Sequence, residues 1–163
     1  WDIGIEKYIV KNRIISPNQI EPSSSIFKQF HIKNLGNSSS EFSLEEFWKY
    51  EDSLPVQEYD FTGSTLPFAM KRLDYLAVGG WDIMYPSPHV VDWDFFAKCE
   101  YLGFDMVRVY KHFYHFAGMA TRKTPEQDRI SIEKEQAAHL FFEAKWGERA
   151  QHNRETNSKA LSI

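Results

Sequence analysis

The sequence is poor in cysteine: Cys99 is the single thiol in 163 residues, which excludes a disulfide within the chain. Cys99 lies in an apolar helical pattern, where a buried thiol is much more common than a catalytic one, and the cysteine usage gives no sign of an oxidising compartment. No apolar run reaches the length of a membrane span, and no signal peptide is recognisable. We therefore expect a cytoplasmic protein without a membrane span.

Long runs of positive charge are also missing. Lysine and arginine together number 19 and the acidic residues 23, which gives a formal net charge of −4 and argues against nucleic acid as a partner. Aromatic residues, by contrast, make up 16% of the chain and supply large groups for a core. The composition predicts one globular domain or part of one.

The segment from Pro67 to His115 carries the most informative pattern. Gly79 and Gly80 follow a short helical pattern, and glycine at the end of a helix permits the positive φ that a sharp turn needs. Trp81 and Asp82 complete this predicted turn.

An acidic pair follows the turn. Asp92 and Asp94 precede a helical apolar spacing that Gly103 closes, so both carboxylates are predicted at a helix N-terminus. The segment from Asp105 to Phe116 is rich in Val, Tyr and Phe and predicts a strand with His115 at its far end. We expect the two acids and the histidine to converge.

This order resembles the C-terminal half of the inverting family 2 glycosyltransferases of the GT-A fold. Their pattern is roughly a Gly-Gly-aromatic-Asp turn, an acidic helix start, a glycine-ended helix, a strand and a histidine. The matching segments are Pro67–Arg72, Gly79–Asp82, Asp92–Phe95, Gly103, Tyr114–Phe116 and, more loosely, Phe141–Gly147. Together they span about half the chain, and their order is more specific than any one of them. The resemblance implies an α/β fold: the C-terminal portion of a GT-A-type, Rossmann-like domain, with a mixed sheet and flanking helices.

The resemblance also implies roles for single residues. Asp92 matches the acid that deprotonates the acceptor hydroxyl; family members often have Glu-Asp here, whereas this chain has Val91-Asp92, so Asp94 is kept as a second catalytic candidate. His115 matches a histidine that helps to hold a divalent metal, Mn²⁺ or Mg²⁺, or the nucleotide diphosphate. The acceptor pocket is matched by the turn residues Gly79, Gly80, Trp81 and Asp82.

The chemistry of sugar transfer needs such groups. A hydroxyl that attacks an anomeric carbon loses its proton as the bond forms, and a carboxylate within hydrogen-bond reach accepts it. The departing nucleoside diphosphate gains negative charge, which a divalent cation neutralises. Arg122 and Lys123, which follow the predicted strand, are candidates for contacting the diphosphate. The implied partners are a nucleotide-sugar donor and a carbohydrate or other hydroxyl acceptor.

Each of these residues also has a simpler interpretation. Asp92 and Asp94 are suited to capping a helix, and His115 lies among aromatic residues where a backbone partner would satisfy it. Arg122 and Lys123 suit a solvated loop. Core packing is the common role of large aromatics, here Trp81, Trp93, Phe95 and Phe96, although Trp81 beside the glycine turn is the best candidate for stacking on a sugar.

Asp92-Trp93-Asp94 is not the Asp-x-Asp metal motif of such enzymes, because that motif ends a buried strand upstream of the acceptor region. We therefore interpret residues 1–147 as a partial glycosyltransferase domain on the acceptor side and residues 148–163 as a polar tail. We expect the isolated chain to bind nucleotide-sugar weakly. Two alternatives stay open: a non-catalytic carbohydrate-binding or scaffold module of the same fold, and a metal-dependent hydrolase built on Asp92, Asp94 and His115.

Local signals predict the remaining elements. We expect a short strand over residues 13–16, a loop excursion over 18–40 and a loop over 51–64. Ser43 with Glu46 forms a capping-box pattern that opens a helix. Thr124 followed by Pro125 and Gln127 opens a long helix that Gly147 ends.

Overall fold

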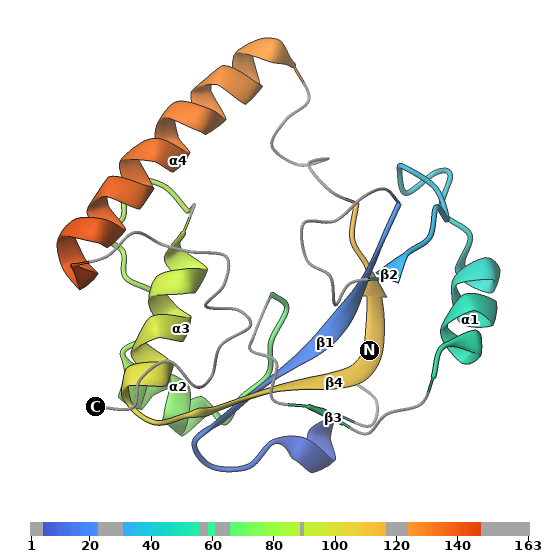
Figure 1. Cartoon of the computed structure of the whole chain (residues 1–163), viewed down its shortest axis with the longest axis horizontal. Coiled ribbons are helices and arrows are strands. Elements are labelled where there is room, and N and C mark those ends of the chain that lie inside the picture. The colour runs from blue at the N-terminus through green and yellow to red at the C-terminus, as the bar shows by residue number, and fades with distance from the viewer. Residues whose placement is uncertain are drawn as a thin grey trace.

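A four-stranded sheet lies at the centre of the molecule (Figure 1). The structure, a computed structural model, describes residues 5–22, 31–55, 59–60, 66–88, 90–116 and 124–147. The strand order is β2-β1-β4-β3. Strands β2, β1 and β4 run parallel to one another, and β3 runs antiparallel to β4. Their bounds are Arg13–Glu21 for β1, His31–Ile32 for β2, Tyr59–Asp60 for β3 and Asp105–Tyr114 for β4.

The pairing of β1 with β4 forms most of the sheet. The prediction of a strand that stops before Pro17 is wrong. The strand continues through Pro17 to Glu21, with all residues after Arg13 buried. Proline lacks the N–H that a central strand uses, and it is tolerated in sheets chiefly at edges and bulges. The register shifts at this position, because Pro17 pairs with Val109 and Asn18 pairs with His112. The irregularity therefore lets an inner strand contain proline.

Two helices cover one face of the sheet. They are α2, Arg72–Val78, and α3, Val91–Tyr101. Their apolar side chains meet Ile14 of β1 and Met106 of β4 in a cluster that includes Phe95, Phe96 and Cys99. The burial of Cys99 confirms the prediction of a packed thiol. Figure 1 shows α2, α3 and α4 on one side of the sheet and α1 on the other.

On that other side, α1 spans Leu44–Ser53. The hydroxyl of its N-cap Ser43 accepts the N–H of Glu46, as the capping pattern predicted. Phe47 packs with Ile20 of β1. The predicted loop over residues 51–64 is wrong in part, because α1 continues to Ser53 and β3 follows at 59–60. The predicted excursion over 18–40 likewise contains the end of β1 and the whole of β2.

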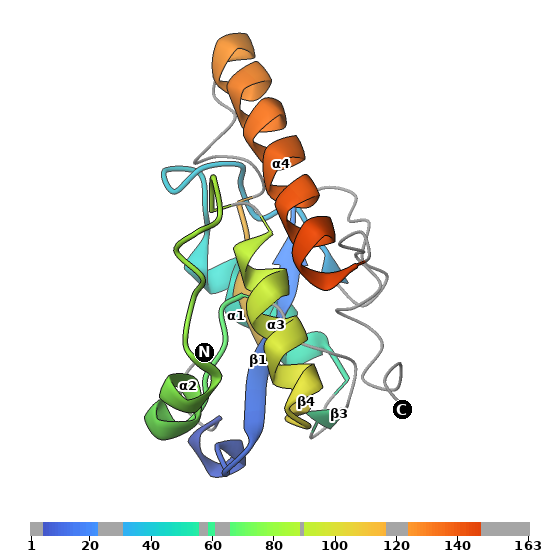
Figure 2. The same ribbon diagram turned by 90° about the vertical axis from the view of Figure 1, so that its left-hand side faces the viewer.

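The long helix α4, Pro125–Trp146, confirms its predicted limits. Thr124 caps its start by accepting the N–H of Gln127, and Gly147 ends it with a φ of 73°. Figure 2 shows that α4 runs past the end of α3 and extends beyond the sheet, and Pro125, Glu126 and Gln127 in its first turn are exposed. A short 3-10 helix, Glu6–Tyr8, precedes β1.

The structure thus confirms a mixed α/β fold with a small, mainly parallel sheet and flanking helices.

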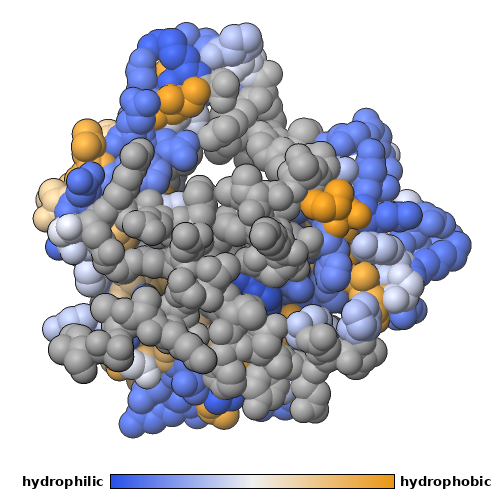
Figure 3. Space-filling view, in the orientation of Figure 1, coloured by the Kyte–Doolittle hydropathy of each residue, from blue (hydrophilic) through white to orange (hydrophobic). Residues whose placement is uncertain are grey.

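On the face shown in Figure 3, hydrophobic side chains occur in small separate groups within a mainly hydrophilic coloured surface. None of the described helices is long and apolar enough to cross a membrane. The predicted polar tail, residues 148–163, lies outside the described residues.

Candidate functional site

A cavity of about 360 Å³ opens beside the N-terminal end of α3 and beneath α4. It combines two tryptophans with two carboxylates and an imidazole. The lining residues are Leu66, Trp81, Pro88, Val90, Val91, Asp92, Trp93, Glu135 and His139. A volume of this size is within the range of pockets that hold small molecules.

Asp92 borders this cavity from the first turn of α3. It is not the N-cap, because that place is taken by Val90. One carboxylate oxygen of Asp92 accepts the N–H of Trp93 at 3.0 Å. The positive end of the helix dipole favours a negative charge at this point. Asp92 is therefore a half-buried acidic residue at the edge of the cavity.

Val90 has a strained backbone at the same place. Its φ is 68°, in the left-handed region, which a β-branched residue rarely adopts. Val90 is also buried and lines the cavity. Strain of this kind persists only when the surrounding contacts enforce it, and such residues cluster at functional sites. The start of α3 is thus held in a fixed conformation beside Asp92.

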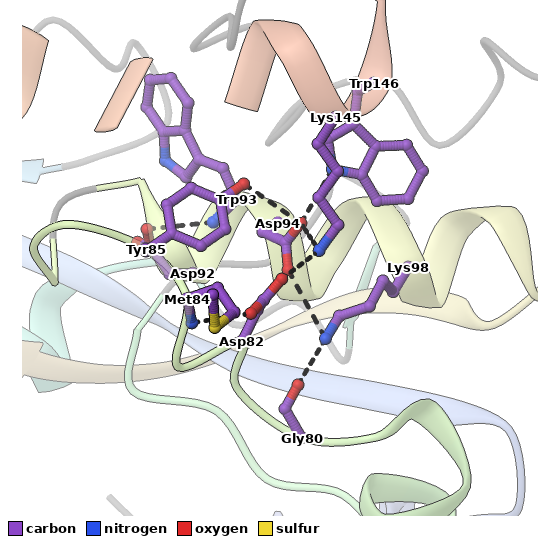
Figure 4. Close-up of polar contacts among 10 residues, drawn as sticks. All are labelled: Gly80, Asp82, Met84, Tyr85, Asp92, Trp93, Asp94, Lys98, Lys145 and Trp146. Carbon is purple, nitrogen blue, oxygen red and sulfur yellow. Dashed lines mark hydrogen bonds and ion pairs between the residues drawn. The ribbon is translucent and has the colours of Figure 1, made fainter. Parts of the chain in front are cut away.

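Asp94 is in a different environment, although it is only two residues away. Its side chain is fully buried, and Oδ1 accepts hydrogen bonds from the Tyr85 hydroxyl at 3.2 Å and from Trp146 Nε1 at 2.8 Å. Lys145 Nζ lies 2.8 Å from the same oxygen, and Lys98 Nζ lies 3.5 Å from Oδ2 (Figure 4). Asp94 therefore joins α3 to the end of α4 and presents no open carboxylate to a substrate.

The charges in this network shift the titration of its members. Burial raises the pKa of the Tyr85 hydroxyl, and the negative charge of Asp94 adds to the rise. The hydrogen bond from Lys145 lowers the pKa of Asp82. Partial burial acts to lower the pKa of Lys145, but its hydrogen bonds to Asp82 and Asp94 outweigh burial and raise it. All three shifts favour a neutral Tyr85 hydroxyl, a charged Asp82 carboxylate and a charged Lys145 ammonium group near neutral pH.

The predicted acceptor turn is present, but its residues are used differently. Gly79 and Gly80 have φ values of 88° and 61°, which confirms the predicted left-handed turn. The Gly80 carbonyl accepts Lys98 Nζ at 2.6 Å, and Asp82 pairs with Lys145 at 2.6 Å. Of the four turn residues, only Trp81 lines the cavity. The other three form or brace the turn.

His115 does not meet the acid pair. It follows the end of β4, and its Nδ1 lies 3.0 Å from Glu21 Oε1 at the end of β1. Figure 1 shows β4 starting beneath α3 and running away from it toward β2 and α1. His115 is also absent from the lining of the cavity. The expected convergence with Asp92 and Asp94 was wrong because β4 bends away, which the sequence pattern does not reveal.

The other candidates for phosphate and metal contacts can be placed only in part. Arg122 and Lys123 lie outside the described residues. Within the described ranges, no group of three or more His, Cys, Asp or Glu side chains is arranged to hold a metal ion. His115 and Glu21 form a pair that supplies at most one coordinating imidazole.

Three aromatic or ionisable residues of the cavity, Trp93, Glu135 and His139, were not assigned to it from the sequence. Trp93 packs against the core cluster that contains Ala138 and Phe142, as the core interpretation predicts, and it also borders the cavity beside Asp92. Glu135 and His139 come from α4, four residues apart on one face of the helix. Their spacing is visible in the sequence, but the packing of α4 over the start of α3 is not. Only the tertiary structure brings them to the cavity.

Comparison with protein-family models, with curated proteins and with solved structures finds no match to this chain.

Proposed function

We propose that this chain is the acceptor-side part of an inverting glycosyltransferase, which transfers a sugar from a nucleotide-sugar donor to an acceptor hydroxyl. The observation that carries the proposal is the contrast between the two acids: Asp92 borders the cavity, whereas Asp94 is buried among cationic and hydrogen-bonding partners. Asp92 is then the general base. Asp94 is a positioning residue that fixes α4 and the Gly80–Asp82 turn around the cavity.

The surroundings of Asp92 suit a sugar acceptor. Trp81 and Trp93 both line the cavity, and indole rings bury the apolar face of a sugar while leaving its hydroxyls free to bond. An acceptor hydroxyl within hydrogen-bond reach of the Asp92 carboxylate loses its proton to it as the oxygen attacks the anomeric carbon. Attack from the side opposite the leaving diphosphate inverts the configuration at that carbon.

A divalent metal, Mn²⁺ or Mg²⁺, is part of this proposal because it would neutralise charge on the departing diphosphate. His115 is the ligand that the resemblance implies, but it contacts Glu21 at 3.0 Å and does not line the cavity with Asp92, so the described residues do not fit a metal site there.

A second candidate function is a carbohydrate-binding module without transfer activity. The observation that favours it is the cavity itself, which combines two tryptophans, able to stack on a sugar ring, with two carboxylates, able to accept hydrogen bonds from its hydroxyls. A metal-dependent hydrolase built on Asp92, Asp94 and His115 is not proposed, because Asp94 is enclosed and His115 lies elsewhere.

The decisive experiment is a transfer assay with the full-length protein, a panel of nucleotide-sugars and a panel of sugar acceptors, with and without Mn²⁺. We expect transfer from at least one donor, and NMR of the product should show an anomeric configuration opposite to that of the donor. Sugar binding without any transfer would favour the binding module. Retention of configuration would contradict an inverting mechanism.

A further inference from the structure

Glu135 and His139 of α4 form a pair whose separation leaves room for one hydroxyl group. His139 Nε2 lies 3.9 Å from Glu135 Oε1, too far for a direct hydrogen bond. Two hydrogen bonds of about 2.8 Å that meet at one oxygen at roughly a right angle hold their outer atoms about 4 Å apart. Both residues line the same cavity as Asp92. The geometry therefore fits a ligand oxygen between them.

The environment of the His139 ring determines which nitrogen faces a ligand. Nδ1 is buried and has no hydrogen-bond partner. The imidazole packs edge-on against Trp93, with ring centroids 5.7 Å apart. A proton on the enclosed Nδ1 would be a buried donor without an acceptor, which is costly. The carboxylate of Glu135 then favours the tautomer with its proton on Nε2.

We infer that Glu135 and His139 clamp one hydroxyl of the acceptor sugar while Asp92 deprotonates another. The clamped hydroxyl accepts a hydrogen bond from His139 Nε2–H and donates one to the Glu135 carboxylate. A hydroxyl both donates and accepts, so it matches this pair, whereas a group that only accepts or only donates satisfies one side alone. The pair is therefore a specificity determinant that requires a second hydroxyl on the acceptor.

This inference deepens the proposed function by naming a polyhydroxylated sugar ring as the acceptor and α4 as the element that selects it. It is independent of the role of Asp92 as a base, because clamping a hydroxyl needs binding and not turnover. A binding measurement with the 163-residue chain therefore tests it separately from sugar transfer.

The probes are the methyl glycosides of glucose, galactose and N-acetylglucosamine and their monodeoxy analogues, with affinities measured by NMR titration. The variants are Glu135→Gln and His139→Gln, and the matched control is Glu133→Gln, which lies on α4 but pairs with Arg129 on the exposed surface. We expect each clamp variant to weaken binding of a fully hydroxylated sugar about five- to tenfold. The control should bind as the wild type does.

The diagnostic result is that the losses of binding free energy caused by the variant and by the deoxy analogue do not add. For one deoxy analogue, the one that lacks the clamped hydroxyl, wild type and both clamp variants should bind equally well. A misfolded variant cannot produce this pattern, because it would weaken every analogue alike. The clamp is overturned if the wild type binds none of the sugars or if the variants lose affinity equally for all analogues.

The two proposals fail in distinguishable ways. If Asp92→Asn leaves transfer intact while the clamp pattern holds, the assignment of the base is wrong and the clamp stands. If Asp92→Asn abolishes transfer while the clamp variants bind every sugar as the wild type does, the clamp is wrong and the base stands.

Discussion

Lys145 Nζ lies 2.8 Å from Asp94 Oδ1 and 2.6 Å from Asp82 Oδ2, so one lysine near the end of α4 joins α3 to the glycine turn. Its two partners come from α3 and from the Gly79–Asp82 turn, and both of these elements contribute lining residues to the cavity. Trp146 adds a hydrogen bond to Asp94 from the next position. The end of α4 is thus anchored to the base of the site, and the earlier turns of α4, with Glu135 and His139, are held over the cavity.

Replacing Lys145 with methionine should destabilise the protein by about 1–3 kcal/mol, because it removes a cation from a fully buried carboxylate. The lysine is itself partly exposed, which keeps the expected cost below that of a fully buried pair. Urea unfolding followed by circular dichroism measures the change. Lys134→Met, on the exposed surface of the same helix, is the control and should change stability by less than about 0.5 kcal/mol. Equal stability of the two variants would contradict the anchoring role.

His112 gives a prediction for the pH dependence of stability. Burial lowers its pKa below the ordinary value of 6.5, and His31 and Lys111 also act to lower it, while Glu51 acts to raise it. The unfolded chain therefore binds a proton at His112 at a higher pH than the folded protein does. Stability from this group is present above about pH 6.5 and is lost as the pH falls toward the lower folded pKa.

The test compares urea unfolding of wild type and His112→Gln between pH 5 and pH 8. We expect the wild type to lose more stability than the variant as the pH falls. A residual slope should remain in the variant, because burial also lowers the pKa of His31. Parallel curves for the two proteins would contradict the assignment of the slope to His112.

Cys99 should be unreactive in the folded protein. It is fully buried, and burial raises the pKa of its thiol to about 12, so the thiolate that reacts with disulfide reagents is scarce. We expect reaction with a chromogenic disulfide reagent at pH 8 to be slower in buffer than in 6 M guanidinium by a factor of a hundred or more. Comparable rates in the two conditions would show that Cys99 is accessible. That result would contradict its burial in the cluster that packs α3 against the sheet.

Local sequence signals predicted several elements with their limits. Ser43 and Thr124 cap α1 and α4 as expected, and Gly79 and Gly147 end helices with positive φ. These features depend on residues within a few positions of one another, so the sequence carries them directly. The limits of β1 were missed because Pro17 signals a strand end, and only the register shift against β4 allows the strand to continue.

The candidate site was predictable only in part, for a related reason. The sequence placed Asp92 and Asp94 in the first turn of one helix, and they are there. It could not distinguish them, because burial of Asp94 depends on Lys145 and Trp146 about fifty residues later in the chain. The positions of Glu135 and His139 at the cavity likewise depend on tertiary packing. The same holds for the course of β4, which leaves His115 outside the cavity lining.

The most direct test of the account is the turnover number of the full-length protein carrying Asp92→Asn, measured with a nucleotide-sugar donor and an acceptor that the wild type uses. Loss of a general base should lower turnover by on the order of a hundredfold or more while folding and nucleotide binding change little. Asp94→Asn, the matched control, should lower stability more and turnover less, because Asp94 is buried among its partners. Equal turnover for wild type and Asp92→Asn would contradict the central claim.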